Sequence, residues 1–202
     1  MYQDGKQEEP SMKSNVHTIT EIAVMTAVLC LLGPISIPTG LVPVSLTPFA
    51  VFLTAYILGM KRGSLSVLIY VLLGMAGIPV FSGYQGGVAK VFGPTGGYII
   101  GFILMALISG AFIDRFNKKL IMQVIGMVIG LLVCYAFGTI WLMYQAHMPL
   151  AGALAAGVFP FIGLDAVKMI LAILIGRPVR GALFRAGLLA EPSGAKTGDA
   201  RS

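Results

Sequence analysis

Hydrophobic residues are gathered along this chain in long blocks. Apolar runs of about the length of a membrane-spanning helix are separated by shorter stretches that contain glycine, proline or basic residues. There are six such runs, at residues 18–33, 46–60, 64–82, 96–113, 120–144 and 150–175. The pattern predicts an all-α membrane protein, a bundle of six transmembrane helices.

The second run is too short to be a simple span. Its purely apolar part, Phe49 to Met60, is below the ~20 residues that a straight membrane-spanning helix needs. It can cross a bilayer only if part of the preceding sequence PVSLTP, residues 43–48, helps to cover the outer layer. The fifth run is the clearest span, and the sixth is expected to be helical from Leu150.

Composition supports a membrane protein. The 202 residues are 57% hydrophobic and 11% charged, whereas a soluble domain has about 25% charged residues. The net charge of +6 does not indicate nucleic-acid binding, because the basic residues lie at the ends of the apolar runs, where they set orientation. Cys30 and Cys134 lie inside apolar runs and are expected to be small buried hydrophobes, with no metal-binding or disulfide spacing.

Basic residues alternate between the connections. The connections at 34–45 (loop 1) and 145–149 (loop 5) have none, and the one at 83–95 (loop 3) has only Lys90. The other connections and the end of the sixth run carry Lys61, Arg62, Arg115, Lys118, Lys119, Arg177, Arg180 and Arg185. The positive-inside rule therefore predicts that both termini are cytoplasmic and that loops 1, 3 and 5 face outward.

The regions outside the runs are short. Residues 1–17 are polar and of mixed charge, and they lack the pattern of a signal peptide. The composition of residues 186–202 is typical of disorder. We expect a cytoplasmic N-terminal segment (1–17), one transmembrane domain (18–180) and a disordered cytoplasmic tail (186–202).

Two charged residues, Asp165 and Lys168, stand alone in the middle of the sixth run. A charge at bilayer depth costs roughly 2.5–3.5 kcal/mol on insertion scales, so such residues usually face a bundle interior and have a partner. Their i, i+3 spacing places both on one helical face. One interpretation is a structural ion pair. Because such pairs rarely contribute net stability, a polar ligand that uses both charges is the better explanation.

Loops 1 and 3 have compositions that suit the outer end of a binding site. Loop 1 is apolar and rich in proline, which favours a lid over a pocket; a segment lying on the bilayer is the alternative. Loop 3 is rich in glycine and contains Lys90. Thr95 can cap the helix that follows, and free N–H groups around Gly96 favour an acceptor or anion; a tight turn with a simple cap is the alternative.

Two tyrosines are further candidate binding residues, and two pairs of small residues are candidate helix-packing sites. Tyr98 and Tyr135 each offer a flat apolar face and one hydroxyl group. The pairs Ala23/Ala27 and Gly126/Gly130 form small-xxx-small faces, which permit close helix packing and are common in any bundle.

Two kinds of catalytic machinery are not visible. The sequence has no G-x-x-x-x-G-K-[ST] phosphate-binding loop, so it shows no ATPase of its own. An intramembrane enzyme that uses Asp165 as acid or base is the alternative function. It would need a second catalytic group at similar depth, and His17 and His147 lie in terminal or loop positions.

Four stretches, at residues 42–59, 61–81, 93–102 and 157–168, share their pattern with a known family. The most specific parts are GPTGGY at 93–98 and the Asp-x-x-Lys of the sixth run. Together they resemble the BioY family, the biotin-specific substrate-binding (S) components of energy-coupling-factor (ECF) transporters. The resemblance covers about residues 18–180.

The resemblance implies the six-helix S-component fold, with the vitamin site near the outer face, in a bacterial inner membrane. It implies biotin capture and uptake rather than catalysis, with no cofactor and no metal; an S component for another small vitamin is the alternative. The implied partners are a membrane coupling protein (T component) and two cytoplasmic ABC-type ATPases. In such transporters the face corresponding to Ala23 and Ala27 contacts the coupling protein.

Biotin fits the candidate residues chemically. Asp165 can accept a hydrogen bond from a ureido N–H, and Lys168 can donate to the ureido carbonyl. The tail carboxylate would then meet Lys90 or the N–H groups of Thr95 and Gly96 in loop 3. Thr47, just after loop 1, is a further candidate binding residue. The opposite placement, with Lys168 on the carboxylate, remains open. We prefer the first, because Asp165 would lie ~22 Å along a helix that starts at Leu150, and a charged tail stays near water at lower cost.

Overall fold

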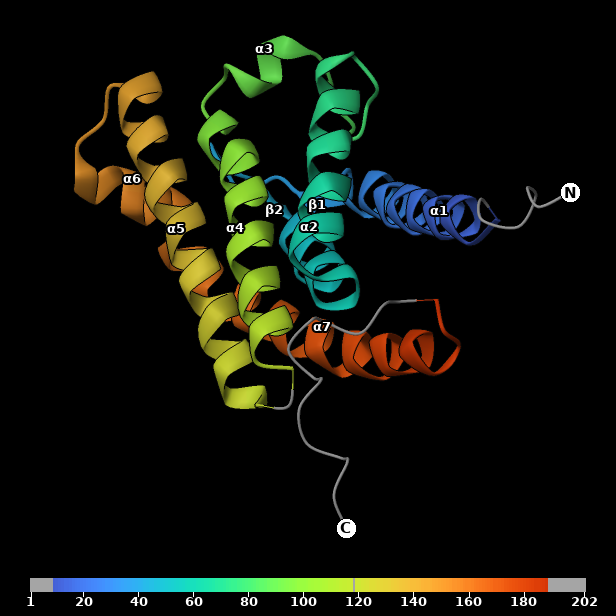
Figure 1. Cartoon of the computed structure of the whole chain (residues 1–202). Helices are drawn as coiled ribbons and strands as arrows, with labels where there is room; N and C mark the ends of the chain where they lie inside the picture. Colours follow the sequence, from blue (N-terminus) through green and yellow to red (C-terminus); the bar gives the residue numbers. More distant parts are fainter. Residues whose placement is uncertain (1–8, 118, 189–202) are drawn as a thin grey trace, which may run out of the picture.

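The computed structural model describes residues 9–117 and 119–188, which form one helical bundle (Figure 1). The long elements are α1 (Glu9–Leu32), α2 (Thr47–Met75), α4 (Gly96–Arg115), α5 (Leu120–Ala146) and α7 (Phe159–Arg185). The short ones are β1 (Ser36–Ile37), β2 (Val44–Ser45), α3 (Val88–Val91) and α6 (Leu150–Gly157). With α2 counted as two halves, and α6 and α7 as one interrupted helix, these are the six predicted helices.

The apolar spans agree with a multi-pass membrane protein. In the described part of the chain, four stretches are long and apolar enough to cross a bilayer: Thr47–Met75, Gly96–Arg115, Leu120–Ala146 and Leu150–Arg185. Residues Val16–Leu32 of α1 form a shorter apolar helix. α1 starts before the predicted residue 18, and α7 continues beyond residue 175. Most of the predicted disordered tail, residues 189–202, lies outside the described residues.

α2 is broken at Gly59, which has φ 75° and ψ −162°. This backbone region is open essentially to glycine alone. A Cβ atom at Gly63 would lie 3.2 Å from the Cα atom of Ala55, although eight residues of straight helix span about 12 Å. The two halves therefore fold back on each other. Lys61 and Arg62 do not form the predicted loop; they belong to the first turn of the second half.

An ion pair from two other helices holds this bend. In an unbroken helix, the Met60 N–H would donate to the Tyr56 carbonyl. Here that N–H donates to Oδ2 of Asp114 on α4, at 2.8 Å, and that carbonyl accepts from Nη1 of Arg180 on α7, at 2.9 Å. Asp114 and Arg180 also pair with each other at 2.6 Å. The ion pair therefore serves both backbone groups at the bend and fixes α4 and α7 against α2.

The sixth run is not one helix. Val158, with φ −129° and ψ −59°, separates α6 from α7. Pro160, in the first turn of α7, has no N–H and is well placed at a helix start. Asp165 therefore lies in the second turn of a new helix. The depth estimate that assumed a single helix from Leu150 is wrong, although the charged pair still lies in the interior.

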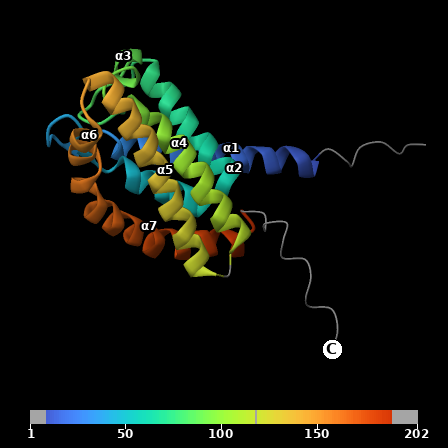
Figure 2. The same ribbon diagram turned by 90° about the vertical axis from the view of Figure 1, so that its left-hand side faces the viewer.

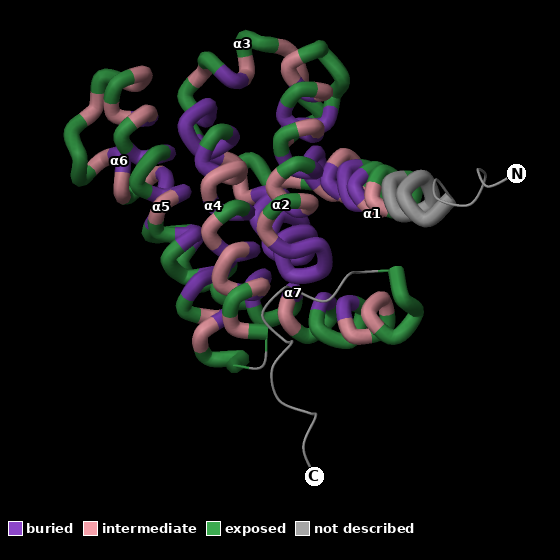
Figure 3. The backbone as a smooth tube through the Cα atoms, in the orientation of Figure 1, coloured by how far each residue is buried: buried purple, intermediate pink, exposed green. Residues whose placement is uncertain are grey.

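α2 is central to the packing. It contacts α1, α4 and α7, while α4 and α5 run side by side. Figure 3 shows buried residues concentrated on α2 and on the faces turned toward it. A Cβ atom at Gly126 would lie 2.1 Å from Cβ of Phe112, which agrees with helix packing as the role of this glycine. Ala23 and Ala27, by contrast, are exposed on α1.

Loops 1, 3 and 5 gather at one end of the bundle (Figure 2). The Gly83 N–H of loop 3 donates to the Pro34 carbonyl of loop 1 at 3.0 Å. The Gln145 side chain donates to the Phe92 carbonyl and so joins the end of α5 to loop 3. This grouping agrees with the alternation of basic residues. Which side of the membrane these loops face stays a prediction.

Candidate functional site

A cavity lies beneath loops 1 and 3, between α2, α4, α5 and α7. The empty space between its lining residues is about 630 Å³, and part of that space is open to solvent. Its polar lining residues are Ser45, Thr47, Ser82, Lys90, Thr95, Asp165 and Lys168. Tyr98 and Tyr135 also line it, so the structure brings together every predicted binding residue except Gly96.

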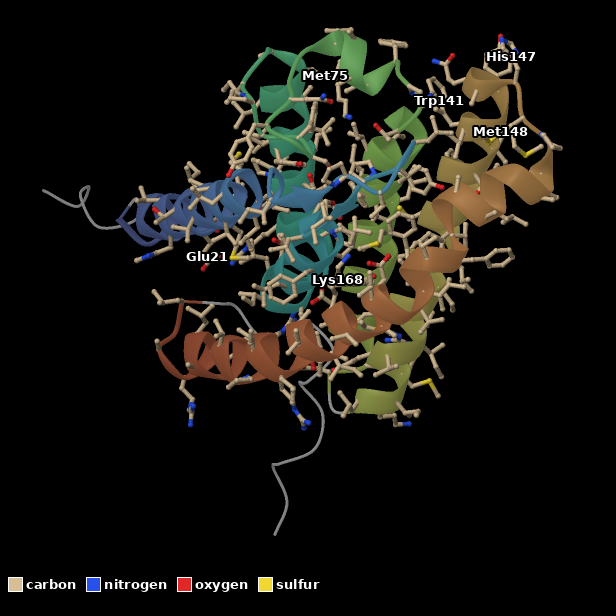
Figure 4. The ribbon with its side chains drawn as sticks, turned by 180° about the vertical axis from the view of Figure 1, so that it is seen from behind. Glu21, Met75, Trp141, His147, Met148 and Lys168 are labelled. Atoms are coloured by element: carbon tan, nitrogen blue, oxygen red, sulfur yellow. The ribbon has the colours of Figure 1, made fainter. Side chains whose placement is uncertain are left out.

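Asp165 and Lys168 form an ion pair at the wall of this cavity. Nζ of Lys168 lies 2.7 Å from Oδ1 of Asp165, and the hydroxyl of Tyr135 donates to Oδ2 at 2.7 Å. Asp165 is 1% exposed and Lys168 is 8% exposed. Figure 4 shows Lys168 where α7 faces the middle of the bundle.

These contacts do not exhaust the hydrogen-bonding groups of the pair. A carboxylate offers about four lone-pair sites, and an ammonium has three N–H donors. Among the described residues, Asp165 accepts one bond at each oxygen and Lys168 donates one. A ligand in the cavity can therefore accept from Lys168 and donate to Asp165 without breaking the pair.

The side chain of Tyr98 is held in place by the protein, and its hydroxyl proton is not free to be donated to a ligand. Its hydroxyl donates to the Gly157 carbonyl at 3.0 Å, next to the break between α6 and α7. A Cβ atom at Gly157 would lie 2.0 Å from that hydroxyl, and one at Gly138 would lie 2.2 Å from the ring. The hydroxyl groups of Tyr98 and Tyr135 therefore both donate to acceptors within the protein. The sequence did not predict these hydrogen bonds.

Loop 3 supplies the wall of the cavity at the end of the bundle where loops 1, 3 and 5 gather. Burial lowers the pKa of Lys90 from its usual value. Thr95 stands at the cap position of α4, but its side chain makes no capping hydrogen bond, contrary to the sequence prediction. Its Oγ1 atom is buried and has no hydrogen-bond partner among the described residues.

Gly96 has a packing role instead of lining the cavity. A Cβ atom there would lie 1.7 Å from the Val91 carbonyl oxygen and 3.1 Å from Nε1 of Trp141. Trp141 donates from this nitrogen to the Gly93 carbonyl at 2.9 Å, and Figure 4 shows it beside α3. The GPTGGY sequence is therefore shaped by close contact with α5 at this point.

Loop 1 lies over the cavity, as a lid would. Its two short strands pair Ser36 with Ser45 and Ile37 with Val44, and Val42 and Pro43 line the cavity. The hydroxyl of Thr47 lies within hydrogen-bond distance of the Gly33 carbonyl (3.3 Å) and accepts from Ser45 (3.0 Å).

The apolar walls could not be assigned from the sequence. They include Tyr70, Phe81, Phe102, Leu131, Cys134 and Phe161. Because the runs are apolar on every face, no periodic pattern marks the side that faces inward.

Cys134 lines the cavity and is buried, in agreement with its predicted hydrophobic role. The described residues contain no group of three or more metal-ligating side chains.

Comparison with known proteins is consistent with this geometry. Residues 6–185 match the BioY family. The chain belongs to the BioY family. It is 40% identical over 157 residues to the biotin transporter BioY of Thermotoga maritima, covering 78% of this chain and 92% of that protein. It is 35% identical over 163 residues to the biotin transporter BioY2 of Lactococcus lactis subsp. cremoris, covering 81% and 90%.

A solved structure agrees in fold. The S-component for biotin from an ECF-type ABC transporter superposes with a TM-score of 0.77, at 31% identity, over 84% of this chain and 93% of that chain. This BioY chain thus has the ECF S-component fold and is a multi-pass membrane protein. Its relatives are named as transporters and not as enzymes.

Proposed function

We propose that this chain binds biotin with high affinity in the cavity and carries it across the membrane as the substrate-binding subunit of an ATP-driven ECF transporter. The relatives named above are biotin transporters, and the matching structure is an S component for biotin. The observation that carries the proposal is the cavity itself, in which a buried donor and a buried acceptor stand beside apolar and aromatic walls.

The charges favour one orientation of the ligand. The ureido group needs an acceptor for its N–H groups and a donor for its carbonyl, and Asp165 and Lys168 offer both side by side. The tail carboxylate placed at this pair would lie next to the negative charge of Asp165, which is unfavourable in a buried site. At the outer wall, Lys90 and the hydroxyl of Thr95 provide donors without a neighbouring carboxylate among the lining residues.

Apolar contacts hold the rest of the ligand. The thiophane ring and the alkyl part of the tail fit against aromatic and aliphatic walls such as Phe81, Leu131 and Phe161. Thr47 and loop 1 then cover the bound ligand from one side. The reverse orientation, with Lys168 on the tail carboxylate, is the competing placement.

Transport requires partners in this proposal. A coupling protein in the membrane and two cytoplasmic ATPases supply the energy of ATP hydrolysis. Ala23 and Ala27 are exposed on α1, as a contact face for the coupling protein requires. Their small side chains allow another helix to approach closely.

Binding of labelled biotin to the purified chain in lipid nanodiscs tests the capture step. We expect saturable binding that an Asp165→Asn replacement weakens by about 30-fold or more, because a buried charge pair loses one member. Val167→Ala is the matched control, since Val167 lies on the same helix and is 54% exposed. Absence of saturable biotin binding would refute the proposal, and tighter binding of another vitamin would support the alternative ligand.

Uptake in cells that contain the coupling protein and both ATPases tests the assembly step. Ala23→Trp and Ala27→Trp are expected to abolish uptake while biotin binding persists, because the bulky side chains separate the two helices. Ala151→Trp is the control, at an exposed alanine on α6. Undiminished uptake in the α1 variants would exclude this face as the contact.

A further inference from the structure

A second recess lies at the outer end of the cavity. Its volume is about 790 Å³, including space that is open to solvent. Leu41 of loop 1 forms one side, and Gln85, Ala89, Lys90 and Thr95 of loop 3 form the other. The recess therefore lies between the two loops that cover the cavity.

The recess and the cavity meet at shared residues. Lys90 and Thr95 line both spaces. On the opposite side, Leu41 lines the recess, and the next two residues, Val42 and Pro43, line the cavity. The two spaces therefore adjoin at Lys90 and Thr95.

Polar groups lie where the two spaces adjoin. Thr95 is 8% exposed, and its Oγ1 atom is buried with no hydrogen-bond partner in the described chain. A buried polar group without a partner is costly, so a ligand with a polar group at this point is favoured. Lys90 adds an N–H donor, and Gln85 at the exposed outer side adds a side-chain amide.

We propose that this recess is a subsite for biotin extended at its tail through an amide bond, such as biotin joined to the side-chain amine of lysine. This inference rests on the proposed function, with the ureido group at Asp165. The amide carbonyl accepts from Thr95 or Lys90, and the amide N–H lies toward the Gln85 side chain. The added amino-acid group occupies the open recess and stays hydrated.

Displacement of labelled biotin from the purified chain in nanodiscs tests the subsite, with biotinyl-lysine as the competitor. We expect biotinyl-lysine to bind within about tenfold of biotin. Ala89→Trp fills the recess without touching the cavity, because Ala89 lines the recess alone. This replacement should weaken biotinyl-lysine by about tenfold or more and leave biotin unchanged. Val88→Trp, at an exposed neighbour outside the recess lining, should change neither affinity.

The outcomes separate this inference from the proposed function. If biotin binds but biotinyl-lysine does not displace it, the recess does not accept extended ligands and the inference is overturned. If biotinyl-lysine binds equally well to wild type and to Ala89→Trp, the conjugate does not use the recess, and the inference is again overturned. If biotin itself fails to bind to the wild type, both proposals are wrong.

Discussion

Two ion pairs involve α7, and they differ in what surrounds them: the pair of Asp165 and Lys168 is buried, whereas in the other pair the Asp114 side chain is 35% exposed. Asp165 and Lys168 face a cavity, and among the described residues their only outside hydrogen bond comes from Tyr135. Asp114 and Arg180 face the bend in α2, where each also binds a backbone group. Arg180 is 6% exposed and in addition lies 5.3 Å from the ring centre of Phe184.

The difference shows why each pair is present. A buried charge needs compensation for its lost hydration. At the bend, much of this compensation comes from the N–H and carbonyl groups that the break at Gly59 separates, although Nε of Arg180 is buried without a hydrogen-bond partner in the described chain. At the cavity the pair keeps donor and acceptor capacity, which a ligand can use. Similar charges in the same bundle thus have a structural role in one place and a proposed binding role in the other.

Removing each pair as a whole should give the largest contrast. The double replacement Asp114→Leu with Arg180→Leu leaves the Met60 N–H and the Tyr56 carbonyl without these partners, and we expect a loss of about 3–5 kcal/mol in unfolding free energy. Asp165→Leu with Lys168→Leu should cost less, about 1 kcal/mol, because only the Tyr135 hydroxyl loses its acceptor and no backbone group depends on that pair, but it should abolish biotin binding. Unfolding in mixed detergent micelles measures both. Equal losses of stability would remove the distinction.

The backbone at the bend allows a smaller test. Gly59→Ala places a side chain at φ 75°, with Cβ only 2.2 Å from Oδ1 of Asp114, and we expect a loss of about 1–3 kcal/mol. Gly181→Ala on α7 is the control, because a Cβ there meets nothing within 4 Å. That control should gain a few tenths of a kcal/mol or remain unchanged. Similar thermal stability of the two variants would show that the bend needs no glycine.

The two cavity tyrosines should differ in their effect on binding. Tyr135→Phe removes a hydrogen bond to a charged carboxylate, and we expect biotin affinity to fall about tenfold. Tyr98→Phe removes a bond to the Gly157 carbonyl and should change affinity less, with its main effect on stability. Titration calorimetry on both variants measures this. A larger affinity loss for Tyr98→Phe would contradict the positioning role of Tyr135.

The smallest expected effect is a dependence on pH at the outer wall. In the proposed orientation of the ligand, the charged form of Lys90 attracts the tail carboxylate, and burial lowers the pKa of Lys90. Biotin affinity should therefore be highest below this pKa and fall as the pH rises through it, starting below the usual range of lysine. The loss should be about two- to fivefold, as for partly exposed ion pairs. Lys90→Met should lack this slope; an unchanged slope would assign it to another group.

The sequence predicted the features that depend on composition and on local spacing. The six helices follow from the apolar runs, and the pairing of Asp165 with Lys168 follows from their i, i+3 spacing. The bend was not foreseen, because its backbone groups are satisfied by Asp114, which accepts a hydrogen bond, and Arg180, which donates one, and both are far from Gly59 in the sequence. The break at Val158 was also missed, since its neighbours are as apolar as a continuous helix would be.

The cavity shows the same limit. Lys90 and Thr95 were predicted because they belong to the glycine-rich loop 3 before a helix start, and Thr47 was a candidate beside loop 1; all three line the cavity. Gly96 was included for its backbone N–H, but its place is fixed by the contacts with Val91 and Trp141. Phe102 and Leu131 could not be distinguished from lipid-facing residues, because only the packing of α4 on α5 turns them inward.

The affinity of biotin for a matched pair of α7 variants tests the central claim most directly. Lys168→Met and Val167→Met change neighbouring residues, one in the cavity wall and one on the exposed face of the helix. We expect saturable binding to the wild type, no change in Val167→Met, and a loss of about 30-fold or more in Lys168→Met at unchanged helix content. Equal biotin affinity of the two folded variants would contradict the assignment of this ion pair to ligand binding.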